Sequence, residues 1–110
     1  MTGDLPFRDV CGVDELPRGE VVAFEAGGRR LLLCNAEGEV FAIAERCSHA
    51  AWDLVGSKLR GAEIVCALHG ARFDLRSGRP TARPASKPID TYAARVREGR
   101  IEVRVPPPPG

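Results

Sequence analysis

Two short motifs constrain this chain more than any other feature, because each combines one cysteine with one histidine. The first is Cys47-Ser48-His49, and the second, Cys66-Ala67-Leu68-His69, follows after sixteen residues. Together they contain the only two histidines of the sequence. A single buried cysteine is often an inert apolar residue, and a single histidine often has a structural role. Two pairs that can each chelate from one loop instead predict a metal centre with two thiolate and two imidazole ligands.

Two kinds of metal site are compatible with these four donors. Structural zinc accepts two cysteines and two histidines, but it usually pairs cysteine with cysteine and histidine with histidine along the sequence. In a [2Fe-2S] centre that has two cysteines on one iron and two histidines on the other, each loop must contribute one ligand to each iron. The mixed pairs therefore favour the iron–sulfur centre. A zinc-stabilised interaction module is the alternative from a different functional class.

The residues around the donors resemble the Rieske family. Its Cys-x-His motif, a spacer of similar length and its Cys-x-x-His motif match Cys47, His49, Cys66 and His69. The run from His69 to Gly78 is similar to the His-Gly-x-x-Phe-Asp sequence and following glycine of Rieske ferredoxins and oxygenases. The resemblance implies one [2Fe-2S] cluster held by these four residues. It also implies the Rieske iron–sulfur fold, in which an antiparallel β base domain carries an inserted cluster-binding subdomain.

The spacing of turn-forming residues independently predicts an all-β chain. Twelve glycines and nine prolines separate short apolar runs, which is typical of strands joined by tight turns. Gly38 is expected to supply a positive φ in one turn, residues 59–62 should form another, and residues 40–44 should be buried on both faces of a strand. Residues 79–88 contain three prolines, too many for a central strand, and favour a stiff surface connection. The expected strands are residues 7–13, 20–25, 30–35, 39–44, 63–66, 72–74, 91–97 and 100–105.

A chain of 110 residues is expected to form one domain. The implied base comprises residues 1–44 and 89–105, and the cluster-binding subdomain comprises residues 45–88. Residues 106–110 read as a stiff, exposed proline-rich tail. The resemblance implies that the proline-containing segment around Pro84 lies against the cluster as a third loop.

Charge and hydropathy exclude several classes. The net charge of +1 argues against a nucleic-acid-binding surface, and Arg29-Arg30, the nearest approach to a basic run, is interpreted as a solvated turn. Neither a secretory signal nor a membrane span is visible, so a soluble cytoplasmic protein is expected. It is also expected to be a monomer without a nucleic-acid or membrane partner. Cytosolic thiols stay reduced, and the remaining Cys11 and Cys34 are expected to be small apolar residues within strands.

Departures from the respiratory-chain members of the Rieske family point to a low reduction potential. Those proteins have a further cysteine in each loop, joined as a disulfide, where this chain has Trp52 and Leu68. They also have serine and tyrosine hydroxyls that donate to sulfur, where this chain has Ala71 and Phe73. Donors to sulfur stabilise the reduced state, so their loss lowers the potential. We expect about −150 mV, the bottom of the Rieske range.

The resemblance implies the ferredoxin component of an aromatic-ring-hydroxylating dioxygenase system in aromatic hydrocarbon catabolism. Such a protein is an electron carrier and has no catalytic residues. It would accept electrons from an NADH- or NADPH-dependent flavoprotein reductase and pass them to a terminal oxygenase, because the sequence has no spare histidine for a catalytic iron. The alternative within this class is a small Rieske subunit of another redox enzyme, such as nitrite reductase. Residues expected to lie beside the cluster or to contact a partner are Trp52, Leu68, Gly70, Phe73 and Pro84.

Overall fold

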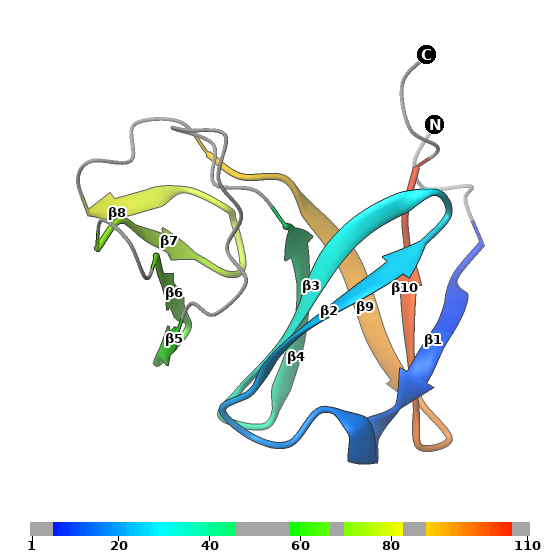
Figure 1. Ribbon diagram of the computed structural model, residues 1–110. Coiled ribbons are helices and arrows are strands. Elements are labelled where there is room, and N and C mark those ends of the chain that lie inside the picture. Colours follow the sequence, from blue (N-terminus) through cyan, green and yellow to red (C-terminus); the bar gives the residue numbers. More distant parts are fainter. Residues whose placement is uncertain (1–5, 46–57, 67–69, 83–87, 107–110) are drawn as a thin grey trace.

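The computed structural model describes residues 6–45, 58–66, 70–82 and 88–106 as ten β-strands and one short 3-10 helix (Figure 1). None of the helical structure in these residues has the length and apolar character that a membrane crossing requires. The elements are β1 (Arg8–Gly12), η2 (Val13–Glu15), β2 (Val21–Ala26), β3 (Arg29–Ala36), β4 (Glu39–Ala44), β5 (Lys58–Arg60), β6 (Glu63–Val65), β7 (Arg72–Asp74), β8 (Pro80–Ala82), β9 (Thr91–Arg97) and β10 (Arg100–Arg104).

Six of the strands form the larger sheet, in the order β1-β10-β9-β4-β3-β2, and all neighbours are antiparallel. The predicted turn at Gly38 is confirmed, because Glu37 and Gly38 have φ angles of 56° and 94°. β4 pairs with β9 only through Ala42 and Ile43, and Figure 1 shows the two strands diverging beyond that point.

The segment around η2 is hydrogen-bonded to both sides of the larger sheet at the end at which β4 and β9 diverge. The backbone N–H of Val13 donates to the Gly99 carbonyl at 3.0 Å, in the turn between β9 and β10. On the other side, the Asn35 side-chain amide donates to the Leu16 carbonyl at 2.9 Å. The Leu16 side chain is 1% exposed and belongs to the core of the larger sheet. Leu16 therefore contributes to the core of the larger sheet near the end at which β4 and β9 are no longer paired.

Strand β4 is buried on both faces, as its sequence predicts. Ala42 packs in one core with Leu33 and Ile101, whereas its neighbour Ile43 packs in the other core with Ile64 and Phe73. Successive residues of a strand point to opposite faces, so β4 lies between the two cores. The second core is shared with the smaller sheet.

The smaller sheet has the order β5-β6-β7-β8, and the hairpin of β6 and β7 confirms the expected pairing of residues 63–66 with 72–74. Two expectations were wrong. Lys58–Arg60 is a strand, and the turn is confined to the following two residues, because Leu59 pairs with Ile64 and packs on the shared core. Pro80–Ala82 is also a strand, tolerated because β8 lies at the sheet edge and begins with its proline.

The two sheets meet where the chain returns from the smaller sheet to the larger one. Ile89 donates its N–H to the Gly78 carbonyl at 2.9 Å, and Ala44 donates to the Asp90 carbonyl at 2.9 Å. A Cβ on Gly78 would lie 2.1 Å from the Ile89 carbonyl oxygen, and its φ is +77°. Only glycine fits this approach without rearrangement.

Candidate metal centre

Cys66 is the one predicted metal ligand among the described residues, and the backbone on both sides of it is fixed. It follows strand β6 directly. Its N–H donates to the Ala71 carbonyl at 2.7 Å, and its carbonyl accepts the Gly70 N–H at 3.0 Å. These two bonds extend the β6–β7 hairpin beyond its last strand residues. The Cys66 side chain is therefore positioned by the sheet.

The surroundings of Cys66 are apolar. Cys66 is 2% exposed and packs in the core shared by the two sheets, together with Ile64, Ala71 and Phe73. A sulfur ligand in such a site is shielded from water, which suits an iron–sulfur cluster whose potential depends on solvent exposure. The donor set of the sequence, two cysteines and two histidines, also suits a Rieske-type [2Fe-2S] cluster. The described part of the site thus fits this group.

The other predicted ligands, Cys47, His49 and His69, lie outside the described residues, as do Trp52, Leu68 and Pro84. Within the described ranges, no three histidine, cysteine or acidic side chains are grouped as a metal site. Of the residues expected near the cluster, Gly70 is exposed and Phe73 is fully buried. The structure therefore describes one predicted ligand and two of the residues expected near the cluster.

Ala71 and Phe73 offer no side-chain hydrogen-bond donor beside Cys66. Both have 0% exposure, and Phe73 is among the largest fully buried side chains. A methyl group and a phenyl ring cannot stabilise additional charge on sulfur by donating a hydrogen bond. Both positions instead exclude water from the side of the core.

The remaining two cysteines are buried within strands of the larger sheet. Cys11 lies in β1 and Cys34 in β3, with 2% and 0% exposure, which confirms the expectation for both. Burial raises the pKa of Cys34 to about 12. Burial also raises the pKa of Cys11, and the nearby Glu15 carboxylate adds to this. Since the thiolate is the form that binds metal, neither thiol is prepared for that role.

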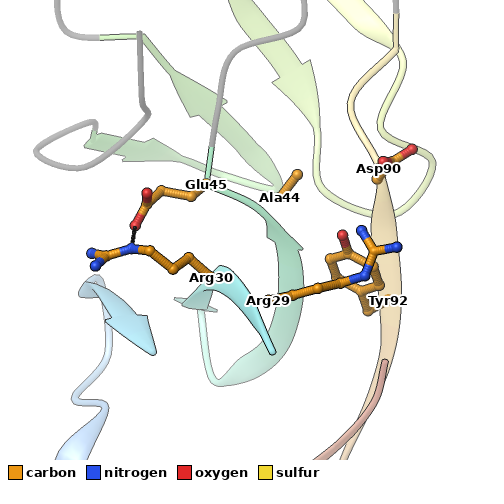
Figure 2. Close-up of a pocket in the computed structure, with 6 residues that line it drawn as sticks. All are labelled: Arg29, Arg30, Ala44, Glu45, Asp90 and Tyr92. Atoms are coloured by element: carbon orange, nitrogen blue, oxygen red, sulfur yellow. Dashed lines mark hydrogen bonds and ion pairs between the residues drawn. The ribbon is translucent and has the colours of Figure 1, made fainter. Parts of the chain in front are cut away.

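A surface hollow of about 320 Å³ lies near the point where the chain leaves and re-enters the larger sheet (Figure 2). Its lining residues are Arg29, Arg30, Ala44, Glu45, Asp90 and Tyr92. The interpretation of Arg29-Arg30 as a solvated turn was wrong, because both residues begin β3. Arg30 Nε donates to Glu45 Oε2 at 2.9 Å, and Arg29 Nε donates to the Pro106 carbonyl at 2.8 Å. Two arginines and two carboxylates line the hollow, so its electrostatic potential is not predominantly positive or negative.

Comparison with known proteins identifies several close matches. The family model described as the Rieske [2Fe-2S] domain matches residues 7–93. The ferredoxin component of biphenyl 2,3-dioxygenase from Rhodococcus jostii (strain RHA1) is 38% identical over 92 residues, which is 84% of this chain and 86% of that protein.

Two solved structures have the same fold. The ferredoxin of Sphingomonas yanoikuyae B1 superposes with a TM-score of 0.83 at 30% identity, covering 92% of this chain and 100% of that one. The ferredoxin of carbazole 1,9a-dioxygenase from Nocardioides aromaticivorans IC177 also gives a TM-score of 0.83, at 34% identity, with coverage of 88% and 95%.

Proposed function

The chain belongs to the Rieske [2Fe-2S] domain family, and we propose that it is the ferredoxin component of an aromatic-ring dioxygenase system. It is an electron-transfer protein with one [2Fe-2S] cluster and is not itself the enzyme. The observation that carries this proposal is the match to the ferredoxin component from Rhodococcus jostii over most of both chains.

Four residues of the sequence would hold the cluster. Cys47 and Cys66 would bind one iron, and His49 and His69 the other, as the mixed pairing of the two motifs favours. A cluster with these ligands accepts and returns one electron at a time. Of these residues, Cys66 is supported by its fixed backbone and apolar burial. We further propose that residues 45–88 form the cluster-binding subdomain within a single domain whose base is residues 1–44 and 89–105.

The chain's own side chains favour a low potential. Ala71 and Phe73 are buried beside Cys66 and have no hydroxyl group. We therefore propose a potential near the bottom of the Rieske range, about −150 mV. A low potential suits a carrier that receives electrons derived from a nicotinamide cofactor.

The proposed partners are proteins of the same system. An NADH- or NADPH-dependent flavoprotein reductase would supply electrons, and a terminal oxygenase would receive them. This chain would work as a cytoplasmic monomer, and its contact with the oxygenase would lie around His49 and His69, with neighbours such as Trp52 and Pro84. The two ferredoxins named after dioxygenases among its relatives support the assignment to such a system.

Spectroscopy and reconstitution test the proposal. The purified protein should contain two irons and two sulfides per chain, and dithionite should produce the electron spin resonance signal typical of histidine-ligated clusters. A flavoprotein reductase with NADH should then reduce the protein, and the reduced protein should support a terminal oxygenase. A colourless protein with one zinc would refute the carrier function, and a cluster that no reductase can reduce would refute the place in a dioxygenase system.

A further inference from the structure

The near-neutral net charge conceals an uneven distribution along the chain. Residues 45–88 contain eight lysines and arginines against four acidic residues, a net charge of +4. The rest of the chain contains eight basic and eleven acidic residues, a net charge of −3. The segment with the cluster motifs is therefore the positive part of a charge-separated molecule. Such separation orients charged partners during approach.

Strand register places two of these positive charges in one row of the smaller sheet. Val65 pairs with Lys58 on one side and with Arg72 on the other. Residues paired across antiparallel strands point to the same face, and this face is opposite to the one on which Ile64 and Phe73 enter the core. Lys58 is exposed, and Val65 and Arg72 are partly exposed. We call Lys58, Val65 and Arg72 the basic row.

The basic row is the row of this face nearest to Cys66. Val65 directly precedes Cys66, and Arg72 directly follows Ala71, whose carbonyl accepts the Cys66 N–H. The next row away from the site, Arg60, Glu63 and Asp74, contains two acids and one base. Positive charge on this face is thus concentrated at the end beside the metal ligand.

The charges of the basic row are not neutralised within the described part of the chain. Neither Lys58 nor Arg72 forms an ion pair with a carboxylate there, whereas Arg76, Arg95 and Arg100 pair with Glu39, Glu102 and Asp9. Two positive charges beside an electron-transfer site can attract a negatively charged protein surface. At physiological salt this attraction acts over a Debye length of about 8 Å, which is enough to include charges on adjacent residues.

We propose that the basic row is a docking surface for an acidic patch on the protein that accepts the electron. The proposal rests on the electron-carrier function proposed above. It adds that the acceptor docks on the outer face of the smaller sheet, that this face is positively charged, and that Lys58 and Arg72 carry the charge. Charge complementarity would increase the rate of encounter and orient the acceptor toward the Cys66 end of the sheet. Val65, between the two charges, offers a small apolar contact at the centre of the row.

Two inorganic oxidants of opposite charge test the sign of the field. Ferricyanide is a trianion and tris(phenanthroline)cobalt(III) is a trication, and each removes one electron from the reduced protein. Stopped-flow mixing at increasing salt should show oxidation by ferricyanide slowing by about tenfold and oxidation by the cobalt complex accelerating. Equal or reversed salt dependence would overturn the proposal.

Charge-reversal variants locate the field. Lys58→Glu should lower the ferricyanide rate at low salt several-fold and raise the cobalt rate. Arg97→Glu changes the net charge by the same amount at the far end of β9, near the turn to β10 (Figure 1), and it should leave both rates nearly unchanged. Equal effects of the two variants would mean that only the net charge acts, which would overturn the docking surface.

A polyanion tests docking without electron transfer. Poly-L-glutamate, titrated by calorimetry, should bind the wild-type protein and the Arg97→Glu variant equally, and the Lys58→Glu variant several-fold more weakly. Equal binding to all three would overturn the proposal. A protein that reduces neither oxidant would refute the carrier function, and the poly-L-glutamate titration would still decide whether the basic row attracts an acidic surface.

Discussion

Arg76 binds both carboxylate oxygens of Glu39 and thereby links the loop after β7 to the start of β4. The two bonds measure 2.8 Å to Oε2 and 2.6 Å to Oε1, and the guanidinium lies 5.2 Å from the centre of the Phe41 ring. This pair raises the pKa of the arginine by hydrogen bonding and by charge. The contact joins the two sheets on the surface, beside the core that they share.

The Arg76–Glu39 pair should contribute little to stability. Both side chains are more than half exposed, so water and salt weaken their attraction. Arg76→Gln and Glu39→Gln should each lower the urea midpoint slightly, and the double variant should show coupling that disappears at high salt. Urea unfolding of all four proteins in low and high salt measures this coupling. A coupling unaffected by salt would contradict the argument.

Gly78 should tolerate no side chain. Gly78→Ala would add a Cβ 2.1 Å from the Ile89 carbonyl oxygen at a φ of +77°. The backbone strain alone costs about 1–2 kcal/mol, and the clash adds to it. Gly61→Ala is the control, because its φ is +60° but no atom lies within 4 Å of the added Cβ. Thermal unfolding should show a clearly larger loss for Gly78→Ala, and equal losses would show that the approach at Ile89 is not tight.

Introducing hydroxyl groups beside Cys66 should raise the reduction potential. Ala71→Ser and Phe73→Tyr place potential donors at the two buried positions that lack one, and a hydrogen bond to sulfur favours the reduced state. The expected change is tens of millivolts, a small part of the roughly 450 mV range of Rieske centres. Protein-film voltammetry measures it, with Cys11→Ala as the control because Cys11 packs in the other core. A fall in potential in both variants would contradict the role of these positions.

Stability should decline at alkaline pH through Cys34. Its pKa is raised from 9.0 to about 12 by burial, so between these values the unfolded chain loses a proton that the folded protein keeps. The folded state is therefore progressively disfavoured from pH 9 upward, with a limiting slope of about 1.4 kcal/mol per pH unit. Urea unfolding between pH 8 and 10.5 should show a shallower decline for Cys34→Ala. Identical slopes would show that this thiol does not titrate as argued.

The same burial should protect Cys34 from thiol reagents. A thiol with a pKa of about 12 has almost no thiolate at pH 8, and Cys34 is 0% exposed. Iodoacetamide at pH 8 should leave Cys34 unmodified in the folded protein and modify it in urea, as mass spectrometry of the digested protein would show. Modification of the folded protein at the rate seen in urea would contradict the burial.

Most of the larger sheet could be predicted from the sequence because its signals are local. Alternation of Ile101, Val103 and Val105 with charged residues identifies β10, and the glycines at the hairpin turns fix the ends of its neighbours. Strands β5 and β8 were missed because residues 59–62, which include Gly61, were interpreted as a turn, and the prolines of residues 79–88 as a sign of an irregular connection. β5 is a strand because it pairs with β6, and β8 is a strand because it pairs with β7. The residues of β5 and β8 alone do not predict this pairing.

In the candidate site, too, local sequence patterns could be predicted, whereas arrangements that depend on pairing between strands could not. Cys66 was proposed as a ligand from its spacing to His69, a local pattern, and this assignment stays a prediction. The position of Lys58 beside Val65 and Arg72 depends on register across three strands, which no short segment specifies. One signal was available in the sequence: the excess of basic residues between positions 45 and 88. Counting charge by segment, instead of over the whole chain, would have pointed to it.

The bond between Ala44 and Asp90 has a consequence for how the chain could be rearranged. The two residues lie on either side of a long excursion, yet they are hydrogen-bonded neighbours at 2.9 Å, so departure and return are only one strand spacing apart, about 4.8 Å. A tight hairpin spans that separation as readily as a long insertion does. An insert of different length could therefore be exchanged at this point without changing the strand order of the larger sheet, provided that its ends adjoin and that it covers the apolar face to which Ile43 points.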